Sequence, residues 1–448
     1  MQRIVVKKFD PLIDVKIDIS NIVVLIGESA SGKSTLAKLV YFFTRLKDEI
    51  FTTIRFSDLD IENRGIDDFT LNISQEIFDK YKGLFGEDLI IDSSVTATYG
   101  KGNNENSPSQ FKVCFSSETE NKSIKYFYGS LIDVIKKIVT ENDIVLNNLK
   151  LSQTKKDNSA KEHYEKQLQN NINCFFFDQT TSIYIPAGRS FTSWLNEKMK
   201  LNFYSTLSDV VKSHSIGKHG YLDYKIMLDF INHVSVVKDR FRNESIESYL
   251  NSNFLITKDN NDNYNPIINE LIKEILHGSY KNDNDSEFIL LENGKKIPLE
   301  NSSSGQQEVI RIIQEIVERK TSFRVIEEPE AHLFPTAQKQ LVEMISVLSK
   351  LTTDNNNDEY NSKIVITTHS PYILAAFNNL LFAEKIGIEN ERIKPLMWIN
   401  QNQLKAYKME KGKAVDIFDY ELGLIKNEEI DEASNIINKE YDFIENLK

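Results

Sequence analysis

The sequence has no apolar run as long as the roughly 20 residues that a helix needs to cross a bilayer. Its first residues, Met1-Gln2-Arg3-Ile4, lead into a strand pattern rather than into a signal peptide. We therefore expect a cytoplasmic protein with no membrane partner.

Cysteine is scarce, with two in 448 residues. Neither Cys114 nor Cys174 stands in a Cys-x-x-Cys or Cys/His cluster, which excludes a readable disulfide scaffold or zinc site. Each cysteine lies in an apolar stretch, and this setting predicts buried thiols.

Basic charge is in deficit, with 54 Lys+Arg against 66 Asp+Glu and a formal net charge of −12. This balance argues against a nucleic-acid surface along the whole chain but leaves a local basic patch open. The content of 40% hydrophobic and 27% charged residues is that of a globular protein, and the length predicts about two or three structural units.

The N-terminal pattern predicts strands. Apolar and polar residues alternate from Arg3 to Ile19 around a turn at Asp10-Pro11, which indicates an antiparallel hairpin. The continuous apolar run Ile22–Ile26 predicts a central strand buried on both faces, and a helix is expected over 34–45. A loop at 101–108 and a strand at 111–115 follow.

Helical spacing dominates the middle of the chain. From Leu131 to Ile172 it predicts a helical hairpin, interrupted by the charged segment 155–161. Asn/Asp-rich breaks at 258–265 and 281–286 are expected to be surface loops. The first break resembles the start of a calcium loop but lacks its Gly and closing Glu, so we assign no calcium site. Strands at 396–399 and 404–409 and a helix at 431–444 are expected in the tail.

The segment Gly27-Glu28-Ser29-Ala30-Ser31-Gly32-Lys33-Ser34 fits the phosphate-loop pattern GxxxxGK[ST] between a buried strand and a helix. The glycines let successive backbone N–H groups face a phosphate, and the helix adds its positive N-terminal end. We expect Lys33 to reach the β- and γ-phosphates of ATP and Ser34 to bind Mg²⁺.

Two later strands end in polar residues. The run 323–326 leads into Glu327-Glu328, where one carboxylate suits Mg²⁺ and the next polarises the attacking water, so Glu328 is the expected catalytic base. The alternative is an ordinary acidic pair at a strand end. The strand 364–368 ends at His369, which we expect at the same sheet edge as a γ-phosphate contact.

Small residues stand before a further predicted helix, in Asn301-Ser302-Ser303-Ser304-Gly305-Gln306-Gln307-Glu308. Alone, the pattern is only a helix N-cap. Beside the other motifs it is a second phosphate-facing helix end, which suggests a dimer that shares nucleotides.

The order of these motifs resembles ABC-type ATPases of the RecF/Rad50/SMC kind, within the AAA ATPases, and most of all the compact ATPases of bacterial phage-defence systems. The resemblance implies an α/β fold: an ATPase head with a central mixed sheet, N-terminal antiparallel strands, an inserted helical hairpin and a helical signature lobe. It divides the chain into 1–125 (head with Walker A), 126–178 (hairpin), 179–300 (helical lobe), 301–390 (rest of the head) and 391–448 (C-terminal strands and helix).

By this resemblance the chain is an ATP hydrolase whose catalytic residues are Glu328, His369 and Lys33, and Ser34 and Glu327 are the metal ligands. The nucleotide-binding residues it implies are Gly27, Glu28, Ser29, Ala30, Ser31, Gly32, Lys33, Ser34, Thr35, Ser303, Gly305 and Gln306. Glu330 to Leu333 is the D-loop. Glu327 stands where most ABC proteins have Asp, the signature is Ser-Ser-Ser-Gly-Gln, and Arg189 is the candidate in place of a Q-loop glutamine.

The resemblance also implies partners. Such heads bind two ATP molecules between two head-to-tail copies, as a homodimer or a higher homo-oligomer. The ATPase subunits of PARIS and Septu defence systems are the best match. They act with a separate nuclease effector, here of TOPRIM or HNH type, and respond to a phage-encoded trigger protein. Two alternatives stay open: a RecF-like repair ATPase that binds DNA directly, and a nucleotide-binding scaffold that hydrolyses little.

Overall fold

The computed structural model describes residues 1–56, 61–100, 110–120, 123–141, 158–178, 181–193, 205, 221–242, 244–252, 265–283, 286–318, 323–350, 362–389 and 392–426. The predicted loop at 101–108, most of the break at 258–265, the start of the charged segment at 155–161 and the C-terminal helix at 431–444 lie outside these residues. The expected domain boundaries stay predictions.

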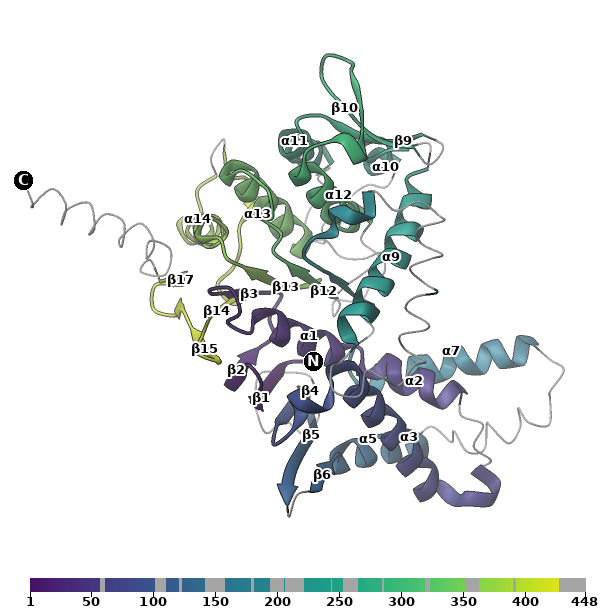
Figure 1. The fold of residues 1–448 in the computed structure, drawn as a ribbon. Helices are drawn as coiled ribbons and strands as arrows, with labels where there is room; N and C mark the ends of the chain where they lie inside the picture. The colour runs from purple at the N-terminus through teal and green to yellow at the C-terminus, as the bar shows by residue number, and fades with distance from the viewer. Residues whose placement is uncertain are drawn as a thin grey trace, which may run out of the picture.

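One large mixed sheet organises the described part of the chain (Figure 1). In spatial order its strands are β6 (Ser123–Phe127), β5 (Phe111–Glu120), β4 (Ser94–Tyr99), β1 (Arg3–Phe9), β2 (Leu12–Asp18), β15 (Lys413–Asp416), β14 (Leu404–Glu410), β3 (Ile22–Ile26), β13 (Lys363–Thr368), β12 (Phe323–Glu327) and β7 (Ser182–Ile185). From β14 to β7 neighbouring strands are parallel, whereas β1, β2, β4, β5 and β6 pair antiparallel. The expected α/β head with a central mixed sheet and N-terminal antiparallel strands is confirmed.

The central strands are buried on both faces, as the run 22–26 predicts. Val23 and Leu25 of β3 join one hydrophobic core, and Ile22 and Val24 join the other. This follows from the period of two in a strand, which points successive side chains to opposite faces. Continuous apolar sequence is therefore needed here, because helices cover both sides.

Helices form the two outer layers (Figure 1). One core takes residues from α1 (Lys33–Thr44), α2 (Leu46–Phe56), α3 (Ile61–Phe85), α4 (Glu87–Ile90), α5 (Gly129–Glu141) and α7 (Asn158–Phe175). The other takes residues from α10 (Ile246–Ser252), α11 (Asn265–Leu276), α12 (Ser304–Glu318), α13 (Pro335–Lys350) and α14 (Pro371–Ile386). The long helix α9 (Leu222–Arg240) contributes to both. The predicted helical hairpin thus corresponds to α5 and α7.

A small antiparallel sheet belongs to the helical lobe. It consists of β11 (Lys296–Pro298), β10 (Ser286–Leu290), β9 (Ser279–Asp283) and β8 (Glu244–Ser245). The predicted surface loop at 281–286 is therefore wrong at both ends, because residues up to Asp283 and from Ser286 pair as strands. Its Asn and Asp residues are turn formers, and a run of them also suits a tight hairpin.

Short elements complete the described chain. They are the 3₁₀ helices η1 (Arg189–Ser193), η2 (Leu299–Asn301) and η3 (Pro395–Met397) and the strand pair β16 (Phe418–Asp419) and β17 (Leu424–Ile425). The strand predicted at 396–399 is wrong, because η3 begins at Pro395, whose fixed φ suits the first turn of a helix. The strand predicted at 404–409 is confirmed as β14.

The prediction of two buried thiols is wrong. Cys174 is exposed and Cys114 is half-buried, and both are free thiols. In α7 the core contact is made by Leu168 and Ile172, so Cys174 lies on a different face of the same helix. Apolar neighbours in sequence do not bury a helical residue, since only one face of a helix packs.

Among the described residues, no helix combines the length and the apolar character that a membrane crossing requires.

Candidate functional site

Three neighbouring parallel strands bring the predicted site residues to one edge of the sheet. Ile26 at the end of β3 pairs with Thr368 at the end of β13, and Glu327 at the end of β12 pairs with Thr367. Parallel strands end at the same edge, where α/β folds bind ligands. The phosphate loop, His369 and the Glu327-Glu328 pair therefore lie next to one another.

The phosphate loop joins β3 to α1. Gly32 precedes the helix with a φ of 93°, a left-handed conformation that favours glycine, and a Cβ there would lie 2.6 Å from the Leu12 side chain. No side chain caps α1, so the N–H groups of its first turn are available to a phosphate. Ser34, in that first turn, is exposed.

Lys33 lies over the phosphate loop. Its Nζ donates hydrogen bonds to the carbonyl oxygens of Gly27, at 2.8 Å, and Glu28, at 2.7 Å. Burial lowers the pKa of the Lys33 ammonium from its usual value, against the attraction of Glu328 and Glu330. A polyanion in the loop would compete for this ammonium by the same attraction.

Glu327 and Glu328 are adjacent in sequence but have different surroundings. The Glu327 side chain is buried, and its carboxylate accepts a hydrogen bond from the backbone N–H of Ala187 at 3.2 Å. Glu328 has a φ of 41°, and its carboxylate, which is 40% exposed, lies 3.2 Å from Nε2 of His369. The exposed carboxylate beside an imidazole is the one that can take a proton from water.

Glu330 is a further residue of the site, and it contacts the end of β13. Its Oε1 accepts hydrogen bonds from the Thr368 hydroxyl, at 2.6 Å, and from the backbone N–H of His369, at 2.8 Å. It therefore holds the end of β13 and the histidine that follows. The only signal in the sequence is an acidic residue directly after Glu328-Pro329.

The signature segment forms a capping box at the start of α12. Ser303 N–H and hydroxyl donate to Oε1 of Gln306, and the Gln306 N–H donates back to the Ser303 oxygen at 3.2 Å. The N-cap reading is therefore correct, and Ser303 nevertheless stays exposed. Gly305 is buried, and a Cβ there would lie 2.5 Å from the His332 carbonyl oxygen, so glycine is needed for this close approach.

Arg189, the candidate in place of a Q-loop glutamine, is enclosed by the protein. Its side chain has no exposure to solvent, and it contacts backbone carbonyls and Glu308. Its contacts join segments more than 100 residues apart, which no local pattern could indicate.

One of the comparisons with known proteins shows a family. A family model described as "AAA ATPase domain" matches residues 1–374. No curated protein matches significantly. Similar solved structures include an SMC head domain from Thermotoga maritima, with 10% identity, a TM-score of 0.35, and coverage of 93% of this chain and 97% of that chain. Another is an Smc head domain with an extended coiled coil, bound to the C-terminal domain of ScpA and derived from Pyrococcus furiosus. It has 12% identity, a TM-score of 0.35 and coverage of 98% of both chains.

With TM-scores of 0.35, these solved structures are only distantly similar to this chain. The family match is broad, because it spans residues 1–374 of 448 and includes the phosphate loop, the signature segment, the acidic pair and His369. The chain belongs to the AAA ATPase domain family.

Proposed function

We propose that this chain is an ABC-type ATPase that binds and hydrolyses ATP between two head-to-tail copies. The observation that carries the proposal is the meeting of the phosphate loop with Glu328 and His369 at one sheet edge, where the last two lie 3.2 Å apart. The exposure of Ser303 at the start of α12 supports a shared site, because a second copy can reach its side chain.

Each residue has a role in this proposal. The N–H groups of the phosphate loop and Lys33 bind the β- and γ-phosphates. Glu328 takes the proton of the attacking water, and His369 donates a hydrogen bond to the γ-phosphate and orients Glu328. Ser303 of the partner subunit completes the charge stabilisation.

The metal ligands fit magnesium. Ser34 and Glu327 offer a hydroxyl and a carboxylate, which are the hard oxygen donors that Mg²⁺ prefers. When bound, Mg²⁺ neutralises charge on the β- and γ-phosphates. Glu327 is one methylene longer than the usual aspartate. The Ala187 N–H bond to its carboxylate fixes where that longer side chain ends.

The biological role in this proposal is a nucleotide-controlled switch in antiphage defence. The ATP-bound oligomer holds or releases a separate nuclease effector of TOPRIM or HNH type, and a phage-encoded protein is the trigger. This part rests on the resemblance of the ordered motifs to defence ATPases, whereas the ATPase part rests on the site.

Size-exclusion chromatography with light scattering tests the shared site. Glu328→Gln is expected to bind MgATP and accumulate as a dimer, because the water is no longer activated. Lys33→Ala is expected to weaken ATP binding at least about tenfold, since a charge-assisted hydrogen bond contributes about 1.5–3 kcal/mol. The double variant should stay monomeric. A Glu328→Gln protein that is equally monomeric with and without saturating ATP would refute the shared site.

The effector is tested with the same variant. Tagged Glu328→Gln is co-expressed with its native neighbouring genes and purified with ATP. A stoichiometric nuclease-like protein in the mass spectrum supports the defence switch. A high 260/280 nm ratio from bound nucleic acid, without such a protein, would instead support a RecF-like enzyme that binds DNA directly.

A further inference from the structure

Arg189 joins two elements that carry opposite parts of the proposed site. It follows β7 in the segment Pro186-Ala187-Gly188-Arg189 and begins η1. Its side chain is completely buried. One end of the guanidinium faces the end of β12, where Glu327 is the last strand residue and Glu328 follows it. The other end faces α12, which begins at the signature segment.

The first set of contacts holds the backbone of Glu327 and Glu328, which we call the catalytic turn. Nη1 of Arg189 donates to the Glu327 carbonyl oxygen at 2.9 Å, and Nη2 donates to the Glu328 carbonyl oxygen at 3.2 Å. Glu328 has a left-handed φ, and a residue other than glycine keeps such a conformation only where its surroundings impose it. The guanidinium supplies part of that constraint, so the position of the base depends on Arg189.

The second set of contacts holds α12, the helix that follows the signature segment. Nε of Arg189 donates to the Glu308 carbonyl oxygen at 3.0 Å and lies 3.4 Å from Glu308 Oε2. The other carboxylate oxygen of Glu308 accepts from the backbone N–H of Ser190 at 3.1 Å. Glu308 is 1% exposed and lies in α12, five residues after Ser303, which caps the start of this helix.

Arginine is the side chain that these partners require. Its planar fork presents five donors in fixed directions, which lets one group bind carbonyls on two elements, whereas lysine presents its donors from a single atom. Burial lowers the pKa of Arg189, and Glu308, Glu330, Glu327 and Glu328 oppose that shift. A buried ion pair contributes little net stability, so specificity of arrangement is the better reason for its presence.

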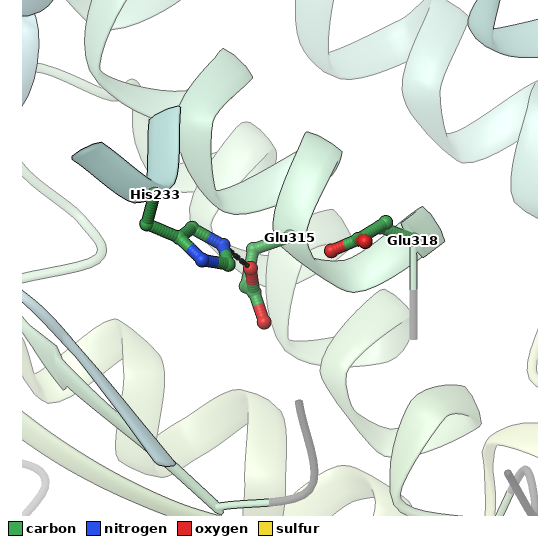
Figure 2. A group of neighbouring side chains, drawn as sticks. All are labelled: His233, Glu315 and Glu318. Atoms are coloured by element: carbon green, nitrogen blue, oxygen red, sulfur yellow. Dashed lines mark hydrogen bonds and ion pairs between the residues drawn. The ribbon is translucent and has the colours of Figure 1, made fainter. Parts of the chain in front are cut away.

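The other charged residues of α12 make anchors of a different kind. Arg311 binds Glu287 of β10, with Nη1–Oε1 at 2.6 Å and Nη2–Oε2 at 2.9 Å. Further along, Glu315 meets His233 of α9 (Figure 2). Glu315 also lies 3.3 Å from Arg324, and Glu318 pairs with Arg240. These contacts fasten α12 to the lobe and to the start of β12, away from the catalytic turn.

His233, Glu315 and Glu318 also have the composition of a metal site (Figure 2). Each of the two carboxylates already pairs with an arginine, Arg324 or Arg240. Their charges are therefore balanced within the protein, and a divalent cation here would have two guanidinium groups as neighbours. These residues are anchors of α12.

We propose that Arg189 is a positioning residue that links the two ATP sites of the dimer through each subunit, an inference that rests on the proposed function. Glu328 acts on the ATP of its own subunit, whereas Ser303 acts on the ATP of the partner. When Glu328 engages the attacking water, its carbonyl moves with the turn. Arg189 transmits that movement to Glu308 and along α12 to Ser303.

Three conservative variants test the link. Arg189→Lys removes the guanidinium fork, and Glu308→Gln removes the side-chain charge that faces Arg189 Nε, while the bond to the Glu308 carbonyl oxygen stays. Arg311→Lys is the matched control, because Arg311 is also buried and lies on α12 with Glu308. Arg311 binds Thr192 of η1, Glu287 and Gln314 but makes no described contact with Glu327 or Glu328. For each, the MgATP dissociation constant, the turnover number, the Hill coefficient for ATP and the melting temperature are measured.

Both link variants are expected to keep the MgATP dissociation constant within threefold of wild type, to lose at least tenfold in turnover number, and to lower the Hill coefficient from above 1 to 1. Arg311→Lys is expected to melt earlier yet keep turnover and cooperativity. Glu308→Gln decides the outcome if Arg189→Lys fails to fold, because it retains an oxygen that accepts from Ser190.

The proposal is overturned if Arg311→Lys loses as much turnover as the link variants, or if wild type hydrolyses ATP with a Hill coefficient of 1. Failure of the proposed function looks different. In that case wild type shows no ATP turnover, or Glu328→Gln forms no dimer with ATP, before any link variant is compared.

Discussion

Single backbone angles and single hydrogen bonds decide what the acidic residues can do. The left-handed φ at Glu328 separates two consecutive carboxylates, so Glu327 is buried against the Ala187 N–H and Glu328 is open beside His369. Glu330, two residues later, turns back to hold the strand that carries His369. Three acids within four residues therefore have three different roles.

Loss of the Glu330 carboxylate should slow hydrolysis without preventing ATP binding. Glu330→Ala leaves the Thr368 hydroxyl and the His369 N–H without their acceptor. A hydrogen bond to a charged group contributes about 1.5–3 kcal/mol, so a loss of about tenfold or more in turnover number is expected. Glu330→Gln keeps one oxygen acceptor and should lose less. Steady-state ATPase assays and nucleotide titrations measure both, and equal losses in the two variants would contradict this role.

The helix α12 illustrates how an element can be polar on one face and still be buried. Its apolar residues join the hydrophobic core, and Glu308, Arg311, Glu315 and Glu318 recur every three or four residues on another face. That spacing alone predicts a solvent-exposed face. In the structure each of these charges is buried against an opposite charge on a different element.

Acid should destabilise the lobe through Glu287. Burial would raise the pKa of this carboxyl, but Arg311 and Lys238 outweigh burial and lower its pKa to about 2 from a usual value of 4.5. A depressed pKa gives stability that is complete above the unfolded value and is lost as the pH falls toward the folded value. The contribution should therefore disappear between pH 4.5 and about pH 2.

Unfolding of Glu287→Gln checks this pH dependence. Breaking a buried ion pair costs about 3–5 kcal/mol, so the variant should be clearly less stable than wild type at pH 7. The difference should shrink as the pH falls below 4.5, because the carboxyl of the unfolded wild-type chain then becomes protonated while the folded one stays ionised down to about pH 2. Glu300→Gln is the control, because Glu300 is an exposed acid that lies shortly before α12. Parallel stability curves for Glu287→Gln and wild type would contradict the assignment.

In the described part of the molecule, exposed apolar side chains lie near the sheet edge that carries the site. Phe334 is 74% exposed and follows the D-loop, whose His332 carbonyl approaches Gly305 of the signature segment. Tyr372 is 54% exposed in the first turn of α14, close after His369. A second copy seated on this edge would cover them, which agrees with the proposed shared site.

Phe334→Asp should block ATP-dependent dimer formation in the Glu328→Gln background while leaving ATP binding within about threefold, because a buried charge without a partner disfavours an interface. Ile388→Asp is the matched control, since Ile388 is 69% exposed but lies beyond the far end of α14. Light scattering with and without ATP separates the two. A dimer that persists in Phe334→Asp would place the interface elsewhere.

Local chemistry was readable from residue order. The phosphate loop, the acidic pair and His369 each follow a short apolar run, and such runs become parallel strands whose ends meet, so their common edge could be predicted. Residue order could not reveal that Arg189 binds Glu308 and Glu327, 119 and 138 residues away, or that Glu330 holds His369. Periodicity reports which face of an element is apolar but not which element lies against it. The partners of buried charges are therefore decided only when distant segments pack together.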